Sequence, residues 1–295
     1  MKYIPAKTLI YKTGGSEMAD WVDYSMNIYR GCSHGCIYCD SRSLCFKNPD
    51  FDTVMAKENA LAIIRDDLRR KVKKGVIATG AMSDPYNPFE QELKLTRHAL
   101  ELINAFGHGV SIVTKSDMVM RDLDILQDIK QNAPVSVNFS ITTADDELCK
   151  IIEPHTANTS KRLEALAHLA GGGIFCGVYI NPVLPFITDN PENILKIVRM
   201  AKQAGASFVH TYMSMTLRPG SREYYYKQLD AHLPGIKDKY IKKYGYSKYC
   251  PPANAKQLWV QFVSECNKLG LMHDMRTIVR KNRAHYKPDQ QLKFI

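Results

Sequence analysis

The sequence predicts an α/β fold built around a mostly parallel sheet. Short apolar runs alternate with longer amphipathic segments, and 295 residues with 45% hydrophobic content can bury one large core. Each apolar run is joined to the next through a segment long enough for a helix, which is the connection that parallel strands require. By itself, this pattern fits both a doubly wound sheet and a partial (β/α) barrel.

The strands are predicted where apolar residues form uninterrupted runs, as they do in strands buried on both faces. They are expected at residues 24–29, 76–80, 110–115, 135–142, 174–183 and 208–213. Helices are predicted where apolar residues recur at helical spacing, at residues 56–74, 93–106, 121–131, 161–170 and 192–204. In the first helix, Ala60, Ile64 and Leu68 share one face, basic residues fill the C-terminal half, and Gly75 ends the helix.

The two ends of the chain differ from this alternating part. Residues 1–23 are polar and irregular, and we expect them to wrap around a core formed by residues 24–215. Residues 216–295 contain a run of tyrosines within 222–233, an amphipathic helical pattern at 253–269 and then a basic tail. We expect this C-terminal part to be a helical extension packed on the core, because its apolar content is too small for an independent domain.

Composition limits the location and the partners. The most apolar stretch, residues 171–187, is too short and too interrupted by proline to span a bilayer, and lysines interrupt every apolar run near the N-terminus. We therefore expect a cytoplasmic protein that has no membrane partner and whose eight cysteines stay reduced. The net charge of +10 suggests an acidic partner such as nucleic acid, although ordinary solvated lysines explain it equally well.

Three of the cysteines form a compact motif. Cys32, Cys36 and Cys39 follow one another at C-x3-C-x2-C spacing, and Gly31 and Gly35 allow the backbone to turn tightly between them. A closed zinc site uses four protein ligands, and no fourth cysteine stands at a matching offset. Three thiolates leave one metal position open for another molecule. By contrast, Cys149, Cys176 and Cys266 lie among apolar residues and are expected to pack in the core.

This motif resembles the signature of radical S-adenosylmethionine (SAM) enzymes, with Tyr38 as its aromatic residue. The surrounding string, from Asn27 to Cys39, is similar to the spore-photoproduct-lyase-like branch. The resemblance implies a partial (β/α)6 barrel and a [4Fe-4S] cluster held by the three cysteines. It also implies reductive cleavage of SAM to a 5′-deoxyadenosyl radical, with electrons from a flavodoxin- or ferredoxin-like donor.

The resemblance also implies residues that contact SAM, and these stand at predicted strand ends, where ligands of parallel α/β folds bind. Ser83 and Asp84 follow the second strand in a segment typical of this branch, and Lys115 would meet the SAM carboxylate. The other implied contacts are Tyr38, Ser140 and Asn181. A proline-stabilised turn and hydroxyl caps at strand ends are ordinary structural explanations for the same residues.

One position departs from the branch. Spore photoproduct lyases use a cysteine as hydrogen donor in a C-T-S-D segment, and Ala81 stands at that place here. Cys45 and Cys250 are the alternatives considered for that role. Aromatic and arginine residues near strand ends could clamp a base or a phosphate, or could simply pack at the barrel rim. They are Tyr29, Arg30, Tyr86, Tyr212 and Arg218.

Three functions follow from these observations. The first is a radical SAM enzyme that acts on nucleic acid, including a carbon–carbon lyase of the photoproduct type. The second is a radical SAM enzyme that modifies a peptide or a small molecule. The third is a zinc-dependent nucleic-acid-binding protein without catalysis.

Overall fold

The computed structural model describes residues 1–14, 21–71, 73–284 and 286. Its main sheet has seven strands in the order β10-β9-β8-β7-β6-β3-β2. The strands of this sheet are β2 (Ile10–Lys12), β3 (Tyr24–Met26), β6 (Val76–Thr79), β7 (Gly109–Thr114), β8 (Val135–Ser140), β9 (Phe175–Tyr179) and β10 (Phe208–His210). All neighbours from β3 to β10 are parallel, and β2 is antiparallel to β3.

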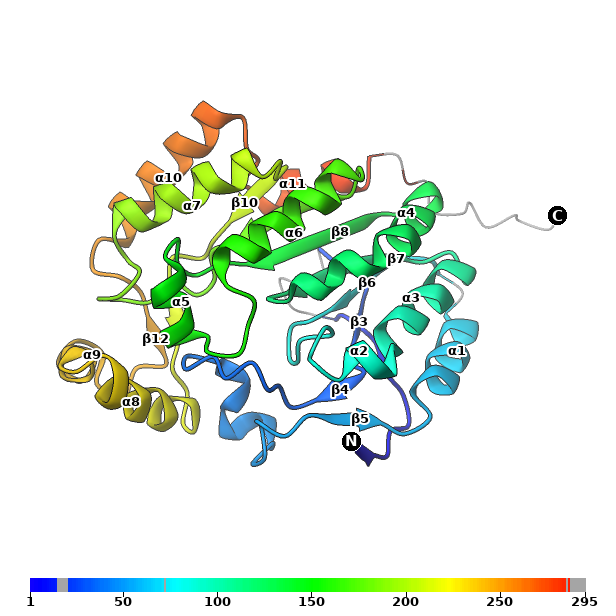
Figure 1. Ribbon diagram of the computed structural model, residues 1–295, viewed down its shortest axis with the longest axis horizontal. Coiled ribbons are helices and arrows are strands. Elements are labelled where there is room, and N and C mark those ends of the chain that lie inside the picture. The colour runs from blue at the N-terminus through cyan, green and yellow to red at the C-terminus, as the bar shows by residue number, and fades with distance from the viewer. Residues whose placement is uncertain (15–20, 72, 285, 287–295) are drawn as a thin grey trace.

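Helices cover one face of this sheet (Figure 1). Those that follow the parallel strands are α1 (Ala60–Arg70), α2 (Glu90–Leu93), α3 (Leu95–Ala105), α4 (Leu123–Asn132), α5 (Asp146–Ile152), α6 (Thr159–Gly171) and α7 (Pro191–Gln203). Alternate strand residues such as Ile77, Ile112 and Val137 are buried in one core with the apolar sides of α1, α3, α4, α6 and α7. The predicted fold class, a partial six-stranded (β/α) barrel with C-terminal helices, is confirmed.

The C-terminal part is helical, as predicted, and contains more helices than the sequence pattern indicated. Its helices are α8 (Ser221–His232), α9 (Ile236–Tyr244), α10 (Ala255–Leu269) and α11 (Met275–Asn282). Helix α10 packs against α7, and a two-stranded sheet joins β11 (Met215–Thr216) to β12 (Tyr249–Cys250). The basic tail was not expected to be helical, yet α11 contains Arg276, Arg280 and Lys281.

Two predicted elements near the cysteines were wrong in detail. The run 24–29 is not one strand: β3 stays in the main sheet, while β4 (Tyr29–Arg30) pairs antiparallel with β5 (Met55–Lys57). Helix α1 begins at Ala60 and not at Ala56, because Ala56 lies in β5 between β4 and β1 (Lys2–Ile4). The small sheet β1-β5-β4 thus takes residues whose local pattern suited a helix, and it supports the start of the cysteine loop.

The N-terminal segment is less irregular than expected, because it contributes β1 and β2. Part of it, residues 15–20, lies outside the described residues, as do residues 287–295 of the basic tail. The domain boundaries after residues 23 and 215 stay a prediction. Cys149, Cys176 and Cys266 are at most 1% exposed, which agrees with their expected place in the core.

Candidate cluster and cofactor site

The cysteine loop runs from the end of β4 to the short 3-10 helix η2 (Asp40–Arg42). Gly31 has φ +79°, and a Cβ there would lie 2.2 Å from the carbonyl oxygen of Thr53. Gly35 has φ +70°, and its Cβ would lie 3.0 Å from side-chain atoms of Pro154 and His155. Both glycines are therefore required by backbone conformation and by close packing, as their place in the motif predicts.

Backbone hydrogen bonds fix the loop to its surroundings. The amide of Cys32 donates to the carbonyl of Phe51 at 2.8 Å, and the amide of Ile37 donates to the carbonyl of Ile152 at 3.0 Å. The loop is thus held between the segment before β5 and the C-terminal end of α5.

The three thiols of the loop are not in disulfides; Cys36 is buried, and Cys32 and Cys39 are partly buried. Burial raises the pKa of all three thiols, that of Cys32 to about 11, and the charges of Cys32 and Cys39 raise that of Cys36 further. Close, desolvated thiols become thiolates together only when cations bind between them, and iron in a cluster supplies that charge. The donor chemistry therefore fits an iron–sulfur cluster.

Side-chain positions do not by themselves identify a metal site. Within the described ranges, no group of three or more His, Cys, Asp or Glu side chains is arranged to hold a metal ion. The assignment of Cys32, Cys36 and Cys39 as iron ligands thus stays a prediction.

A buried ion pair lies directly behind the loop, and sequence reasoning missed it. Glu153 and Arg162 are 2.6 Å apart, both with fully buried side chains. The hydroxyl of Tyr38 donates to Glu153, and Arg162 donates to the backbone carbonyl of Ser140 at 2.7 Å. Burial would raise the pKa of the Glu153 carboxyl, but Arg162 and Lys115 outweigh it and lower that pKa. An ionised carboxylate therefore joins the cysteine loop to the end of β8.

Asp84 forms a second connection, at the ends of β6 and β7. Its carboxylate accepts hydrogen bonds from the Thr114 hydroxyl and the Lys115 amide, each at 2.8 Å. The imidazole Nδ1 of His34, in the cysteine loop, lies 3.5 Å from the same carboxylate. The hydroxyl of the adjacent Ser83 donates to the carbonyl of Gly31. Both side chains are thus engaged within the protein, and their hydrogen bonds hold the loop in position. Their contact with SAM stays a prediction.

Lys115, the one cation among the predicted SAM contacts, lies beside this loop. Its ammonium nitrogen lies 5.8 Å from the centre of the Tyr38 ring. Burial would lower the pKa of Lys115, but the negative charges of Cys36 and Glu153 outweigh it and raise that pKa. A charged lysine beside a desolvated site is suited to an anionic ligand such as a carboxylate.

Ser140 and Asn181 lie at the ends of the next two strands. Ser140 is 6% exposed, and its hydroxyl has no hydrogen-bond partner in the part of the chain that the structure describes. The Asn181 side-chain oxygen accepts from the Tyr212 amide at 3.0 Å, so it joins the ends of β9 and β10. Ser140 is therefore the freer of the two to meet a ligand.

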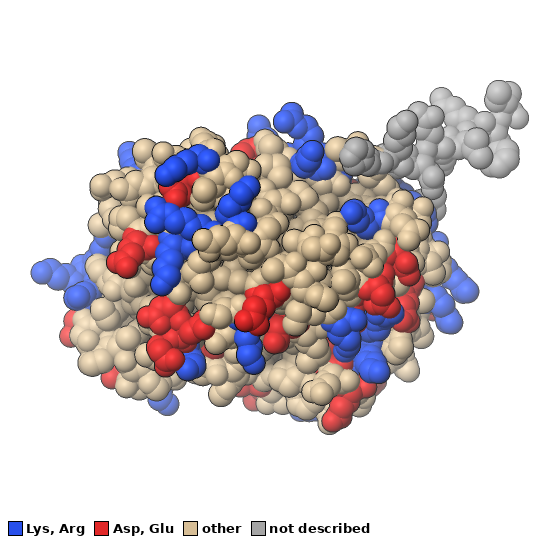
Figure 2. Space-filling model, turned by 45° about the horizontal axis from the view of Figure 1, so that its top comes forward, with Lys and Arg blue, Asp and Glu red and all other residues tan. Residues whose placement is uncertain are grey.

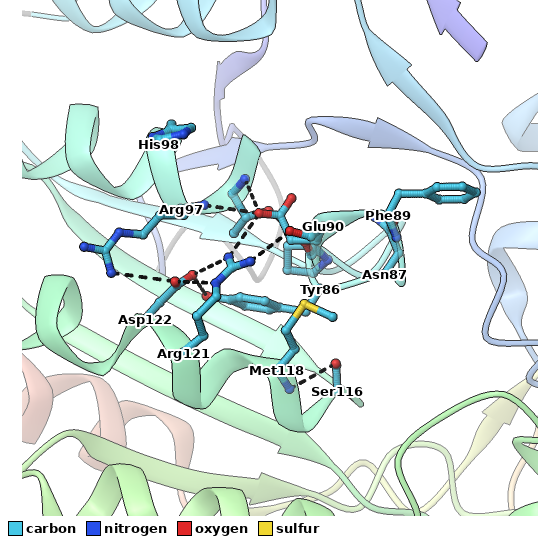
Figure 3. Close-up of polar contacts among 12 residues, drawn as sticks. Tyr86, Asn87, Phe89, Glu90, Arg97, His98, Ser116, Met118, Arg121 and Asp122 are labelled. Carbon is cyan, nitrogen blue, oxygen red and sulfur yellow. Dashed lines mark hydrogen bonds and ion pairs between the residues drawn. The ribbon is translucent and has the colours of Figure 1, made fainter. Parts of the chain in front are cut away.

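A charged network that includes Glu90, Arg121 and Asp122 surrounds Tyr86, one of the expected rim aromatics (Figure 3). Tyr86 is 1% exposed and donates to Asp122 at 3.1 Å, and Arg121 lies 3.1 Å from Glu90. Tyr29, 3% exposed, donates to Glu90. These tyrosines support the two loops from behind and do not face a substrate.

The three remaining candidates differ in their surroundings. Cys250 is fully buried in an apolar cluster with aromatic residues of α8 and α9, and burial raises its pKa to about 11, so it stays a protonated thiol. Cys45 is exposed. Arg218 pairs with Asp40, next to the last cysteine of the loop.

Comparisons with known proteins agree with this architecture. The family model described as the radical SAM superfamily matches residues 26–198. An uncharacterised protein of Mycobacterium tuberculosis is 33% identical over 279 residues, which cover 92% of this chain and 82% of that protein.

Solved structures of spore photoproduct lyase share the fold. The complex with a dinucleoside spore photoproduct has TM-score 0.69 at 17% identity, covering 92% of this chain and 81% of that one. A mutant of that enzyme with bound AdoMet and the same dinucleoside has TM-score 0.64 at 18% identity, covering 85% and 76%. The family match spans more than half of the sequence, and the chain therefore belongs to the radical SAM superfamily.

Proposed function

We propose that this protein is a radical SAM enzyme that acts on a nucleic-acid substrate, with Cys32, Cys36 and Cys39 as the ligands of its cluster. The observation that carries the proposal is the cysteine loop, which two glycines and two backbone hydrogen bonds hold against the strand ends. The cofactors are a [4Fe-4S] cluster and SAM, as in the superfamily. When bound, they supply an electron and a 5′-deoxyadenosyl group that abstracts hydrogen from a substrate.

The residues around the loop have distinct roles in this proposal. The Lys115 ammonium binds the SAM carboxylate, and the Ser140 hydroxyl binds a second polar group of the cofactor. Tyr38 lies beside the adenosine, while Asp84, Ser83 and Glu153 hold the loop in place. Asn181 keeps the ends of β9 and β10 together at the rim of the site. This surrounding protein keeps water and competing hydrogen donors away from the reactive group.

We also propose where the electron donor binds. A cleft of about 700 Å³ lies outside the cysteine loop, with Ser33, Gly35 and Ile37 on one side and α8 on the other. These three residues lie between the cysteines in the sequence, so a flavodoxin- or ferredoxin-like protein in this cleft would approach the cluster closely. The reducing compartment that such a donor needs favours the cytoplasm. Among the helices that the structure describes, none is long and apolar enough to cross a membrane.

Nucleic acid is the preferred substrate class because of charge and exposed aromatic residues. Figure 2 shows a face on which lysines and arginines are interspersed with acidic residues, so that face alone does not suggest binding to a backbone. Around α9, however, Tyr246 is 94% exposed and Tyr249 is 56% exposed. The same stretch of sequence is rich in lysine, at Lys237, Lys239, Lys242, Lys243 and Lys248, and the Lys248 ammonium lies 5.1 Å from the centre of the Tyr249 ring. Basic residues interleaved with exposed aromatics are typical of surfaces that bind single strands.

The test is anaerobic reconstitution with iron and sulfide, followed by incubation with SAM, a reductant and ultraviolet-treated DNA. We expect formation of 5′-deoxyadenosine and a chemical change in the ultraviolet-treated DNA. Undamaged DNA, incubated in the same way, should not change. 5′-Deoxyadenosine without any change in the DNA would favour a peptide or small-molecule substrate. Zinc in place of iron and sulfide would favour the non-catalytic alternative.

A further inference from the structure

The segment that follows helix α5 lies along the cysteine loop. The Ile152 carbonyl accepts from the Ile37 amide at 3.0 Å, and the His155 amide donates to the carbonyl of His34 at 3.1 Å. Glu153 stands between these two contacts in the sequence, at the C-terminal cap of α5. Backbone hydrogen bonds on both sides therefore fix the position of Glu153 relative to the loop.

The Glu153 carboxylate meets the loop through Tyr38, the aromatic residue of the cysteine motif. The Tyr38 hydroxyl donates to one carboxylate oxygen, and Arg162 lies 2.6 Å from the other. The Thr142 hydroxyl lies 3.1 Å from that of Tyr38, so the phenol also has a neutral partner. A neutral acceptor at position 153 would hold Tyr38 equally well, and a buried ion pair adds little stability compared with apolar side chains of similar volume. The charge of Glu153 therefore calls for an explanation beyond support of the loop.

Lys115 and Glu153 place opposite charges near the same cysteine. The Lys115 ammonium lies 5.8 Å from the centre of the Tyr38 ring, whose hydroxyl bonds to Glu153. Burial is the main reason why the pKa of the Cys36 thiol is raised; of the nearby charges, Lys115 lowers that pKa and Glu153 raises it. Negative charge at Cys36 is thus favoured by one of these residues and disfavoured by the other.

The same two charges act on an electron that enters a cluster bound at Cys36. Reduction adds one negative charge, and the reduction potential of an iron–sulfur cluster depends on the charge around it. A carboxylate behind the loop makes that addition less favourable, whereas an ammonium makes it more favourable, and both effects are stronger in the protein interior than in water. A cluster of lower potential is in turn the stronger reductant for the sulfonium of SAM.

We propose that Glu153 is a positioning residue that keeps the reduction potential of the cluster low, through its charge and its hydrogen bond to Tyr38, and that Lys115 acts in the opposite direction. Arg162 keeps the Glu153 carboxylate ionised by pairing with it. The electron comes from the donor protein, and Glu153 itself exchanges neither a proton nor an electron. This inference rests on the proposed function, because it needs a cluster bound to the three cysteines of the loop.

A redox titration tests this inference without any turnover. The full-length, cluster-loaded protein is titrated in the absence of SAM, and the reduced cluster is quantified by its electron paramagnetic resonance signal. In E153Q, which keeps the shape but removes the charge, the ratio of reduced to oxidised cluster at a fixed potential is expected to rise roughly three- to tenfold. E164Q, at an exposed glutamate of α6, should match the wild type. An unchanged potential in E153Q would overturn the inference.

The sign of the shift separates an electrostatic role from a structural one. K115M removes the opposing positive charge and should lower the same ratio, so its midpoint potential moves in the opposite direction to that of E153Q. Distortion of the loop gives no reason for opposite signs at the two residues. A shift of the same sign in both variants, or an unchanged potential in K115M, would overturn the inference.

E153Q leaves the Arg162 charge buried alone and can prevent folding, so a second variant is needed. E153Q/R162M replaces both partners with uncharged side chains, which removes the isolated charge. Its potential should still shift in the positive direction, though less than in E153Q, because Glu153 bonds to the loop directly. An unshifted potential in the double variant would also overturn the inference. A wild-type protein without an iron–sulfur cluster refutes the proposed function instead, whereas a cluster whose potential ignores Glu153 refutes only this inference.

Discussion

Glu153 and Arg162 form a fully buried ion pair, 2.6 Å apart, behind the loop that contains the three cysteines. Tyr38 of the loop donates to Glu153, and Arg162 donates to the end of β8, so the pair connects two segments that are distant in sequence. Burying two charges is unfavourable unless they are paired and hydrogen-bonded, and here both conditions are met.

Replacing Glu153 with Gln should therefore destabilise the protein strongly. The substitution keeps the shape but leaves the Arg162 charge buried without its counterion, at a cost of about 3–5 kcal/mol. In a chain of this size, that loss lowers Tm by roughly 5–15 °C. The matched control is E147Q, since Glu147 pairs with Lys150 at an exposed position where an ion pair contributes about 0–1 kcal/mol. Equal Tm values for E153Q and E147Q would contradict the structural role of the pair.

Gly31 should be essential for cluster assembly. In G31A the new Cβ meets the Thr53 carbonyl at 2.2 Å, and the φ of +79° itself costs an L-residue about 1–2 kcal/mol. The loop must shift, and we expect iron content after reconstitution to fall well below that of the wild type. G14A is the control, because its Cβ would meet nothing within 4 Å. Full iron content in G31A would show that the loop tolerates another conformation.

Loss of the Lys115 charge should weaken SAM binding. A hydrogen bond to a charged group contributes about 1.5–3 kcal/mol, so K115M is expected to raise the Kd of SAM at least roughly tenfold. Equilibrium dialysis with labelled SAM measures this, with K196M on α7 as a control at an exposed lysine. An unchanged Kd in K115M would remove Lys115 from the SAM site.

The stability of the protein should fall in mild acid because of His108. Burial lowers the pKa of this imidazole from 6.5 to about 4, and the nearby charge of Lys74 lowers it further. The unfolded chain thus binds more protons than the folded one between these two values. The free energy of unfolding is therefore highest, as far as His108 is concerned, above about pH 6.5. It decreases as the pH falls from 6.5 towards 4, by about 2 kcal/mol between pH 7 and pH 5.

Urea denaturation at the two pH values measures this dependence. In H108F the difference between them should shrink, whereas in H98Q, which changes an exposed histidine, it should match the wild type. A pH dependence unaffected by H108F would assign the acid sensitivity to other groups.

Much of the architecture can be read from the sequence, because local patterns specify it. Strands such as β6 and β7 are continuous apolar runs, and the cysteine loop is a contiguous motif whose glycines have a conformational reason. Where a residue's position depends on partners distant in the sequence, local patterns do not predict it. Ala56 suits a helix but lies in β5 because β1 and β4 flank it. Glu153 lies outside every predicted element, and Arg162 resembles a surface charge of the helix predicted at residues 161–170, so their pairing could not be foreseen.

In the candidate site, too, some features could be predicted from the sequence and others depend on packing between distant segments. The strand-end positions of Lys115 and Ser140 follow from the order of strands, so the sequence could indicate them. The engagement of Asp84 by Thr114, and the burial of Tyr29 and Tyr86, depend on side-chain packing that no periodic pattern encodes.

The most direct test of the account is to measure iron, sulfide and 5′-deoxyadenosine in C32A, C36A and C39A, with C45A as the control at an exposed cysteine. We predict that each of the first three variants loses the broad absorbance near about 400 nm that is expected of such clusters, together with all 5′-deoxyadenosine formation, while C45A keeps both. A variant of Cys32, Cys36 or Cys39 that retained the cluster and the product would contradict the central claim.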